Sequence, residues 1–465
     1  MFSKILIANR GEVAVRIIRA CKEMGINTVA VFSEADRESL HVSLADESIC
    51  IGPAQVKDSY LNMTAVLSAA AVTGAQAIHP GYGLLSENAR FARLCKESNI
   101  TFIGPSADVI ARMGDKDQAR RTMIEAGVPV IPGSDIVTSV SQAKAEAARI
   151  GYPVLVKARS GGGGRGIRLV SAEAQMEQAF QTAAAEAASA FGDSGLYIEK
   201  YLKPAKHIEM QILCDRQGNV VCLGERECSV QRKNQKLLEE SPSPSLSQPM
   251  REAMIEAAIR AAKAVGYENA GTLEFLADRQ GNFYFMEMNT RLQVEHTVTE
   301  MVSGVDIVKW QIRIAAGASL DFGQKDVVIR GKAIECRINA EDPDHDCRPS
   351  AGTVKLLHTP GGPWVRFDTF LYQEYTVPPF YDSMVGKLIV KANSREEAIR
   401  KMKASLCELV IEGFPTNSEL QLKILSDARF AAGDYDTDFM EQLTGSEGRQ
   451  AHGHGLAQAE KGGQA

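Results

Sequence analysis

Two short segments of the chain alternate polar or charged residues with apolar ones, as strands beside a charged site do. The first covers residues 272–275 and the second residues 285–295. Successive side chains of a strand point to opposite faces, so residues two apart share a face. We therefore predict that one face of the second segment carries the carboxylate, amide and guanidinium groups of Glu287, Asn289, Arg291, Gln293 and Glu295.

The residue types on this predicted face suit a metal ion and an anion. Glu274, Glu287 and Asn289 offer the hard oxygen ligands that Mg²⁺ takes beside the phosphates of a nucleotide. Arg291 offers a planar, forked cation that matches a small oxyanion. The alternative is a solvated strand face with salt bridges, because surface strands commonly alternate polar and apolar residues. The pattern by itself leaves both interpretations open.

The size and charge of the chain limit its class. With 465 residues it is too long for one hydrophobic core, so we expect about two to four packed units. A net charge of −6 argues against a general nucleic-acid binder. We find no run apolar enough to cross a membrane and no signal peptide at the start. Nine cysteines without a CxxC pair indicate reduced thiols, and we predict a cytoplasmic protein.

The first part of the chain alternates short apolar segments with helical patterns. A helix is predicted at residues 12–24, and the turn at residues 8–12 lacks the glycine fingerprint of a dinucleotide site. Alternation of this kind is typical of a parallel sheet with helices on its faces, so this part resembles a Rossmann fold without that cofactor. The predicted strands are 4–8, 28–32, 77–79 and 101–104.

Changes in composition divide the chain further, although we find no internal repeat. The second of two Ala-rich helices follows a glycine loop in a small unit, and a strand-rich part then closes with helices. In that last part Ser394 and Glu397 predict a capping box. The final residues are rich in Gly, Ala and Gln, which predicts disorder. The predicted units are 1–113, a connecting segment 114–133, a lid 134–202, a C-terminal part 203–444 and a tail 445–465.

The glycine loop at residues 157–166 joins two predicted strands. Glycines let backbone N–H groups approach phosphate oxygens closely. Gly161, Gly163 and Gly166 satisfy G-x-G-x-x-G, but a strand follows where a dinucleotide fold needs a helix. The P-loop motif is absent, and an Asp-Phe-Gly triplet at residues 321–323 lacks the other protein-kinase motifs. A phosphate-binding lid and a flexible linker remain as interpretations.

Two lysines and one histidine outside the loop are ambiguous by spacing alone. Lys116 lies where the first sheet ends, and Lys236 closes a basic run at residues 232–236. A charge run of this kind is usually a solvated face. A single histidine such as His207 more commonly forms a structural hydrogen bond than it takes part in catalysis.

Several motifs in one order identify a family. They are residues 5–12, 79–83, the glycine loop, 287–291, 335–342 and 381–384. Together they resemble the biotin carboxylase subunit of bacterial acetyl-CoA carboxylase and related biotin-dependent carboxylases, which are members of the ATP-grasp superfamily. The resemblance spans residues 1–445. It implies an α/β ATP-grasp fold with an N-terminal Rossmann-like parallel sheet, a small glycine-loop lid and a C-terminal α+β domain.

The resemblance also implies a role for each charged group. For metal (Mg²⁺ or Mn²⁺) it implies Glu274, Glu287 and Asn289. For bicarbonate it implies Lys236, Arg291 and the backbone of Val294. For catalysis it implies Lys236, Arg291, Glu295 as the base that deprotonates bicarbonate, and Arg337, which would stabilise carboxyphosphate and bind the biotin enolate. For ATP it implies Lys116, Lys157, Gly163, Gly164, Glu199, Lys200, Tyr201, Leu202, His207, Asn234, Glu274 and Glu287.

Four places depart from the family pattern. Asn234 stands where a histidine is frequent, and Thr297 where proline is usual. Residues 159–160 are larger than the family's, and the pair 347–348 replaces an apolar pair. None of these differences removes a catalytic group.

The implied reaction is the ATP-dependent carboxylation of biotin with bicarbonate, which gives carboxybiotin, ADP and phosphate. Biotin would arrive on a separate biotin carboxyl carrier protein, because the chain has no Ala-Met-Lys-Met acceptor. A carboxyltransferase would pass the carboxyl group on, as acetyl-CoA carboxylase does in fatty acid biosynthesis. The resemblance also implies a homodimer with Arg19, Glu23 and Arg366 as candidate contacts, and no nucleic-acid or membrane partner.

Two other functions stay open from the residues. Another ATP-grasp ligase, joining a carboxylate to an amine, would need the nucleotide and metal residues but not Lys236, Arg291, Glu295 and Arg337 together. A non-catalytic scaffold subunit would be indicated by loss of a metal carboxylate or of the base, and all of these residues are present.

Overall fold

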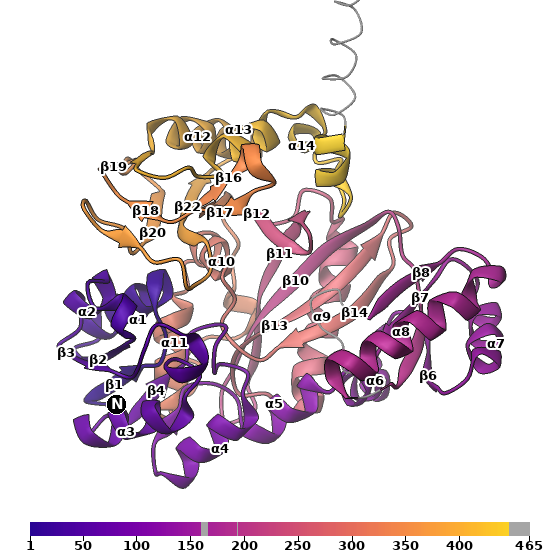
Figure 1. Ribbon diagram of the computed structural model, residues 1–465, viewed down its shortest axis with the longest axis horizontal. Coiled ribbons are helices and arrows are strands. Elements are labelled where there is room, and N and C mark those ends of the chain that lie inside the picture. Colours follow the sequence, from indigo (N-terminus) through magenta and orange to yellow (C-terminus); the bar gives the residue numbers. More distant parts are fainter. Residues whose placement is uncertain (160–165, 193, 446–465) are drawn as a thin grey trace, which may run out of the picture.

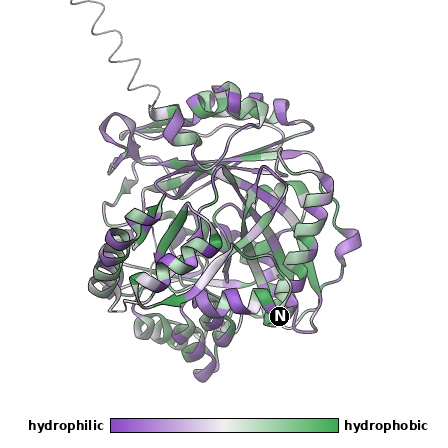
Figure 2. Ribbon diagram, turned by 90° about the vertical axis from the view of Figure 1, so that its right-hand side faces the viewer, coloured by the Kyte–Doolittle hydropathy of each residue, from purple (hydrophilic) through white to green (hydrophobic). Residues whose placement is uncertain are grey.

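The computed structural model describes residues 1–159, 166–192 and 194–445 (Figure 1). In Figure 1 the N-terminal part lies at the lower left, the predicted lid projects at the right, and the C-terminal helices lie at the top. Figure 2 shows green, hydrophobic segments concentrated on strands inside the molecule, with purple segments frequent at its outside. In the described residues, no helix is both long and apolar enough to cross a bilayer.

The N-terminal part is a five-stranded parallel sheet in the order β3-β2-β1-β4-β5. Its central strand β1 buries Ile5 and Ile7 in one hydrophobic cluster and Leu6 in another, so both faces are covered. This confirms the predicted sheet type, although two strands end earlier than predicted. The strands are β1 (Lys4–Ile7), β2 (Asn27–Phe32), β3 (Glu47–Cys50), β4 (Ala77–His79) and β5 (Thr101–Phe102).

Helices cover the faces of this sheet, and further helices follow it along the chain. The predicted helix at residues 12–24 is α1, which spans Gly11–Glu23. Asn62, Asn88 and Ser106 each cap the helix that follows them by accepting a hydrogen bond from a backbone N–H. The other helices here are α2 (Leu40–Leu44), α3 (Met63–Thr73), α4 (Ala89–Glu97), α5 (Ala107–Gly114) and α6 (Lys116–Glu125).

The lid is a small antiparallel sheet packed against two alanine-rich helices. Its strand order is β6-β9-β7-β8, and α7 (Val140–Ile150) and α8 (Met176–Phe191) pack on the sheet through a shared hydrophobic cluster. Residues 160–165 of the glycine loop, including Gly163 and Gly164, lie outside the described residues. The strands are β6 (Gly133–Val137), β7 (Val154–Ala158), β8 (Ile167–Val170) and β9 (Leu196–Lys200).

An eight-stranded antiparallel sheet forms the largest part of the molecule. Its order is β14-β13-β10-β11-β12-β15-β22-β20, so strands far apart in sequence share one sheet. The strands are β10 (Ala205–Cys214), β11 (Val220–Arg232), β12 (Gln235–Ser241), β13 (Asn269–Asp278), β14 (Phe283–Asn289), β15 (Lys332–Asn339), β20 (Val365–Thr369) and β22 (Met384–Ala392).

Helices and short two-stranded sheets complete this part. The helices are α9 (Gln248–Val265), α10 (His296–Ser303), α11 (Ile307–Ala315), α12 (Arg395–Glu408), α13 (Ser418–Ser426) and α14 (Ala428–Ala432). The short pairs are β16 (Glu341–Asp342) with β17 (Arg348–Pro349), β18 (Gly352–Thr353) with β21 (Thr376–Val377), and β19 (Leu356–His358) with β23 (Val410–Glu412).

Two predictions about local structure need correction. The second acidic strand was predicted to run to Glu295, but β14 ends at Asn289. The chain leaves the sheet there because the backbone N–H of Thr290 donates to the Glu87 carboxylate instead of to a neighbouring strand. The predicted capping box of α12 is half right. Ser394 accepts from the Glu397 N–H, but the Glu397 carboxylate accepts from the N–H of Asn393.

No internal repeat was expected, but two hairpin turns of the large sheet have the same five-residue sequence. The hairpins β10–β11 and β13–β14 both close with Asp-Arg-Gln-Gly-Asn, at residues 215–219 and 278–282. In each turn the Asp carboxylate accepts from the N–H groups two and four residues later and from the Asn side chain. Gly218 and Gly281 have φ near +86° and +87°, which glycine adopts without a steric cost.

The aspartates of the two turns differ in one hydrogen bond, which gives a test. Asp215 is buried and also accepts a hydrogen bond from the backbone N–H of Leu320, 2.9 Å away. We expect Asp215→Ala to destabilise the protein by about 1 kcal/mol or more beyond Asp278→Ala, because a buried donor loses its acceptor. Melting temperatures of the two variants measure this. Equal losses would contradict the importance of the Leu320 contact.

Candidate functional site

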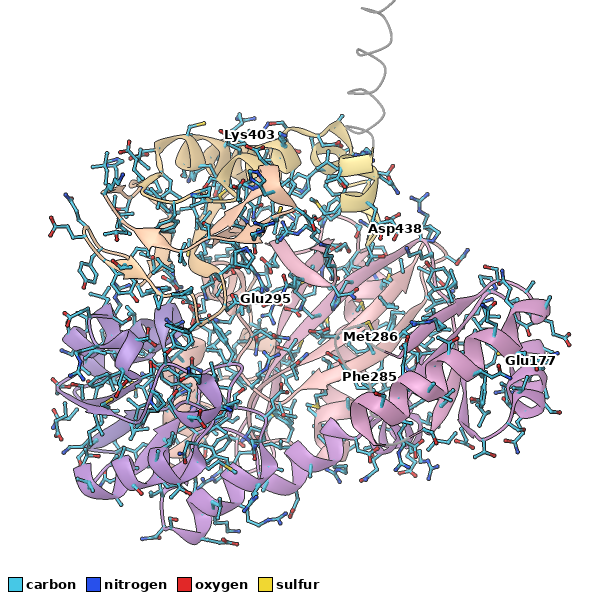
Figure 3. The ribbon with its side chains drawn as sticks, in the orientation of Figure 1. Glu177, Phe285, Met286, Glu295, Lys403 and Asp438 are labelled. Atoms are coloured by element: carbon cyan, nitrogen blue, oxygen red, sulfur yellow. The ribbon has the colours of Figure 1, made fainter. Side chains whose placement is uncertain are left out.

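A cavity of about 820 Å³ is lined by residues of the N-terminal part, the lid and the large sheet. Its volume lies in the range of small-molecule sites, about 300–1,000 Å³. Figure 3 places Glu295, Phe285 and Met286, which line the cavity, in the middle of the view. The predicted site residues on its wall are Lys116, Lys157, Glu199, His207, Asn234, Lys236, Glu274, Glu287, Asn289, Arg291, Val294, Glu295 and Arg337.

Three predicted ATP-binding residues are not on this wall. Lys200, Tyr201 and Leu202 follow β9 or end it, and none of them lines the cavity. The Lys200 Nζ donates to the carbonyl of Gly151, 2.8 Å away, and to that of Tyr152. The Lys200 side chain therefore holds a turn of the lid.

Two lysines and a glutamate converge on one part of the cavity. Lys116 begins α6, and Lys157 on β7 forms an ion pair with Glu199 on the neighbouring strand β9. Burial and the nearby Lys157 cation lower the pKa of Lys116. Burial opposes the charge of Lys157, but Glu199 raises the pKa of this lysine overall. Two like charges that face one cavity are typical of a site for a polyanion.

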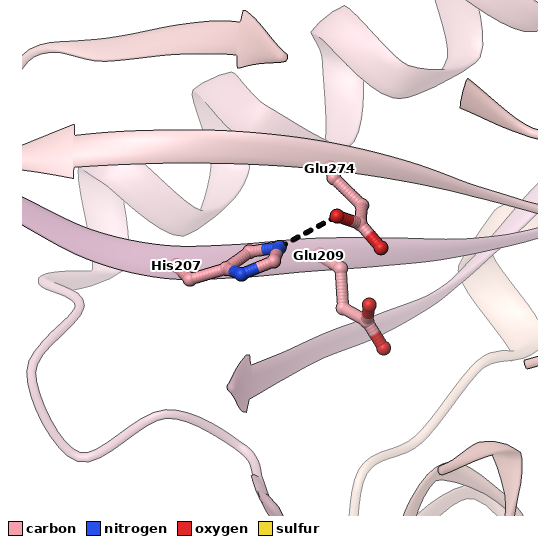
Figure 4. A group of neighbouring side chains, drawn as sticks. All are labelled: His207, Glu209 and Glu274. Atoms are coloured by element: carbon pink, nitrogen blue, oxygen red, sulfur yellow. Dashed lines mark hydrogen bonds and ion pairs between the residues drawn. The ribbon is translucent and has the colours of Figure 1, made fainter. Parts of the chain in front are cut away.

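The predicted metal ligands are brought together by the register of two strands. Glu274 on β13 lies directly opposite Glu287 on β14, and Asn289 is two residues further along the same strand. Glu274 lies 2.7 Å from His207 Nε2 (Figure 4). The Glu274 carboxylate also accepts from Asn289 Nδ2 at 2.9 Å. Burial and the Glu274 charge raise the pKa of Glu287. A cation would relieve this repulsion, so the carboxylate and amide oxygens fit Mg²⁺ or Mn²⁺.

At the cavity wall and behind it, cationic and carboxylate side chains alternate in one continuous series of ion pairs. Glu209 accepts from Lys236 at 2.7 Å, and Lys236 donates to Glu295 at 2.6 Å. Glu295 accepts from Arg337 at 3.0 Å, and Arg337 donates to Glu239 at 2.7 Å. From one end of this series to the other, the paired residues are Arg226, Glu209, Lys236, Glu295, Arg337 and Glu239.

These neighbours shift the pKa values of the buried carboxyl groups in opposite directions. Burial alone would raise the pKa of Glu295, but Lys236 and Arg337 hold it well below the usual range. Glu239 has Arg337 as its close cation, and burial raises its pKa to about 7. Glu295 is therefore an unprotonated carboxylate at neutral pH.

A loop of residues 290–295 carries Arg291 and Val294 into the cavity. The Arg291 Nε donates to Glu87 at 2.9 Å, and its other nitrogens donate to Gln293 and Asn289. Glu295 is the residue immediately before α10. The predicted common face of residues 287–295 is thus formed by a strand followed by a loop, not by one strand.

Arg232 and Lys236, two of the three basic residues in the run 232–236, do not lie on the solvated face that was expected. Lys236 is nearly buried and lines the cavity, and Arg232 donates to Glu341 at 2.6 Å. Lys233 is solvated, with a side chain 72% exposed. Lys233 and Asn234 both have positive φ in the two-residue turn between β11 and β12, as a type I′ turn requires. Asparagine at position 234 suits this backbone.

Sequence reasoning missed three charged groups that the structure brings to the site. Glu209 follows His207 at a spacing of two on β10, among apolar residues 208, 210 and 212. This alternation of polar and apolar residues could have identified Glu209 from the sequence. Glu87 and Glu239 reach the site from a loop and from β12, and their local sequence carries no comparable pattern.

Three family models match the chain in succession. Residues 1–110 match the biotin carboxylase N-terminal domain, and residues 335–442 match the biotin carboxylase C-terminal domain. Residues 115–322 match the ATP-binding domain of the carbamoyl-phosphate synthase L chain.

Curated relatives agree over nearly the full length. Biotin carboxylase 1 of Bacillus subtilis is 55% identical over 443 residues, which cover 95% of this chain and 98% of that relative. The biotin carboxylase of Pseudomonas aeruginosa is 52% identical over 447 residues, or 96% and 99% of the two chains. The chain belongs to the biotin carboxylase family. The resemblance drawn from the motifs is confirmed.

Solved structures of the family have the same fold. The biotin carboxylase domain dimer of Hydrogenobacter thermophilus 2-oxoglutarate carboxylase, in complex with MgADP, ADP and bicarbonate, has a TM-score of 0.90 at 50% identity and covers 95% of this chain and 98% of its own. The β-γ-ATP complex of biotin carboxylase from Campylobacter jejuni has a TM-score of 0.92 at 49% identity, with coverage of 95% and 99%. The predicted ATP-grasp fold class is confirmed.

One departure from the family pattern forms a contact next to the site. The Thr297 hydroxyl donates to Glu335, a fully buried residue two positions before Arg337 on β15. Burial raises the pKa of Glu335 to about 8. A carboxyl group whose pKa is higher in the folded than in the unfolded state stabilises the fold when protonated. That stability is present below about 4.5 and is lost as pH rises through about 8.

We therefore expect Glu335→Gln to weaken the pH dependence of stability. The melting temperature of the unmodified protein should fall more steeply than that of the variant as pH rises from about 4.5 to about 8, the interval set by the two pKa values. Glu256→Gln, on the surface of α9, is the matched control and should keep the original slope. A variant with the slope of the unmodified protein would contradict the assignment.

Proposed function

We propose that this chain carboxylates the biotin of a biotin carboxyl carrier protein, using ATP and bicarbonate, and releases ADP and phosphate. The observation that carries the proposal is that one cavity holds two separate groups of cations. Lys116 and Lys157 suit the phosphates of a nucleotide, whereas Lys236 and Arg337 pair with the Glu295 carboxylate and Arg291 lines the same cavity. A nucleotide and a second small anion could meet there.

Bicarbonate would bind to Lys236, Arg291 and the backbone of Val294. Glu295 is held as a carboxylate by Lys236 and Arg337, so it is available to accept a proton. An anion that shares Lys236 with Glu295 would weaken the hold of this lysine on the carboxylate and raise the pKa of Glu295. The deprotonated bicarbonate is the better nucleophile toward the γ-phosphate, and the product of that attack is carboxyphosphate.

Three oxygen donors would hold the metal ion, namely those of Glu274, Glu287 and Asn289. When bound, Mg²⁺ or Mn²⁺ neutralises charge that develops on the phosphate oxygens. Lys116 and Lys157, which line the same cavity, would orient the same phosphates. His207, 2.7 Å from Glu274 and near Gln231, would fix the orientation of that carboxylate.

Arg337 would act in the second half of the reaction. Its guanidinium is held by Glu239 and Glu295, so its orientation is fixed before a substrate binds. A fixed cation stabilises the negative charge that develops on the biotin ureido oxygen without reorganising.

We further propose that this chain is a cytoplasmic homodimer that works with a carrier protein and a carboxyltransferase. All nine cysteines, which lie in the described residues, are free thiols, as expected in a reducing compartment. Of the candidate dimer contacts, Glu23 pairs with Lys309 and Arg366 pairs with Glu300 and Asp368 within the chain. Light scattering should give twice the chain mass of 50.4 kDa.

The deciding experiment is ATP cleavage by the purified protein, with and without bicarbonate and free biotin. We expect cleavage to require bicarbonate and to rise with biotin. Cleavage that depends on an amine and a carboxylate, and not on biotin, would favour another ATP-grasp ligase. No cleavage under any of these conditions would favour a scaffold.

Glu287→Gln tests the metal assignment. The variant keeps the shape of the side chain but loses a charged ligand, so we expect turnover to fall by at least ~100-fold at ordinary Mg²⁺. Glu256→Gln on the surface is the control and should keep full turnover. Turnover near the unmodified value in Glu287→Gln would refute the assignment.

Arg337→Ala tests the division of roles between the two groups of cations. We expect nucleotide affinity to stay within about tenfold, or ~1.4 kcal/mol, while most biotin carboxylation is lost. Binding of a fluorescent nucleotide and carboxylation of free biotin measure the two effects. A collapse of nucleotide binding with intact chemistry per bound ATP would show the roles to be misassigned.

A further inference from the structure

Lys387 lies directly beneath the loop of residues 290–295, but it does not line the cavity. It is on β22, and its side chain is fully buried. Its partner across the sheet on one side is Arg337 of β15, and on the other side Asp368 of β20. A buried lysine outside a site needs a structural reason, because removing its charge from water is costly.

Two contacts of Lys387 supply that reason. Its Nζ donates to the carbonyl of Val294 at 2.8 Å and pairs with the Glu12 carboxylate at 3.1 Å. Burial opposes the charge of Lys387, but Glu12, Glu335 and Asp368 raise its pKa overall, so it remains a cation.

The carbonyl of Val294 belongs to the peptide group that also contains the nitrogen of Glu295. A donor fixed on this carbonyl therefore sets the orientation of the peptide immediately before the proposed base. At the opposite end of the loop, Glu87 accepts from the Thr290 N–H and from Arg291 Nε, both at 2.9 Å. Glu87 and Lys387 thus hold the two ends of the loop.

Glu12 extends this connection to the N-terminal part. It lies in the first turn of α1, and its carboxylate also accepts from the Tyr82 hydroxyl on the wall of the cavity. One lysine on the large sheet is therefore joined to the loop through Val294 and to the cavity wall through Glu12. Displacement of this lysine would shift both.

We propose that Lys387 is a positioning residue for bicarbonate, which holds the Val294–Glu295 peptide so that the backbone of Val294 and the carboxylate of Glu295 face the anion. This inference rests on the proposed function. Lys387 itself touches no substrate, and its effect passes through the loop. A loss of position of about 1 Å at reacting groups is enough to cost about 100-fold in rate.

The test compares Lys387→Met with Lys391→Met. Lys391 is on the same strand and the same face of β22, but it lies over the ring of Trp364, away from the loop. For Lys387→Met we expect the KM for bicarbonate to rise and kcat to fall, each by about tenfold or more. The Kd for a nucleotide should stay within about twofold, because Lys116 and Lys157 are untouched. Lys391→Met should keep all three values.

A folded Lys387→Met variant with an unchanged bicarbonate KM would overturn the proposal, and so would an equal loss of nucleotide affinity, which indicates a general structural role. If Lys387→Met melts below the assay temperature, Lys387→Met combined with Glu12→Gln removes both buried charges together. The same split between bicarbonate and nucleotide is then expected, and its absence overturns the proposal. The unmodified protein is measured first. If its ATP cleavage does not depend on bicarbonate, the proposed function fails, independently of Lys387.

Discussion

At the cavity wall and behind it, each buried charge is neutralised by a neighbouring side chain of opposite sign. Lys236 lies between Glu209 and Glu295, and Arg337 lies between Glu295 and Glu239. Taking a single ion out of water costs several kcal/mol, and its partners recover this cost only where the geometry is close. The strands of the large sheet supply that geometry, because β10, β12 and β15 place these side chains at fixed spacings. The chemistry proposed for the site depends on this alternation.

The alternation also decides which groups are available to a ligand. Glu295 is kept ionised by two cations, whereas Glu239 and Glu335 have pKa values raised by burial. The proposed base is thus a carboxylate that shares Lys236 with the proposed bicarbonate site. An anion bound there would compete for Lys236, so anion binding and proton transfer would be connected through this side chain.

The cavity is shared by parts of the chain that are distant in sequence. Glu87 reaches the loop of residues 290–295 from the N-terminal part, and Lys387, which pairs with Glu12 of that part, reaches it from β22. The loop has no strand partner for its first backbone N–H, and side chains from these other parts hold it instead. Its conformation is therefore a property of how the N-terminal part packs against the large sheet.

The sequence by itself determined the parallel N-terminal sheet, the two strands that the glycine loop joins, and the family, because these follow from local periodicity and from motifs in a fixed order. It also brought Glu274, Glu287 and Asn289 together as candidates, since strand spacing is local. It could not show that β14 ends at Asn289, that Lys236 is nearly buried, that Glu209 and Glu239 pair with site residues, or that Lys387 holds the loop beside them. Those facts depend on the register between strands and on contacts between parts, and a chain encodes them only through packing over long sequence separations. A period of two places side chains on one face, but only the tertiary structure decides which face meets which charge.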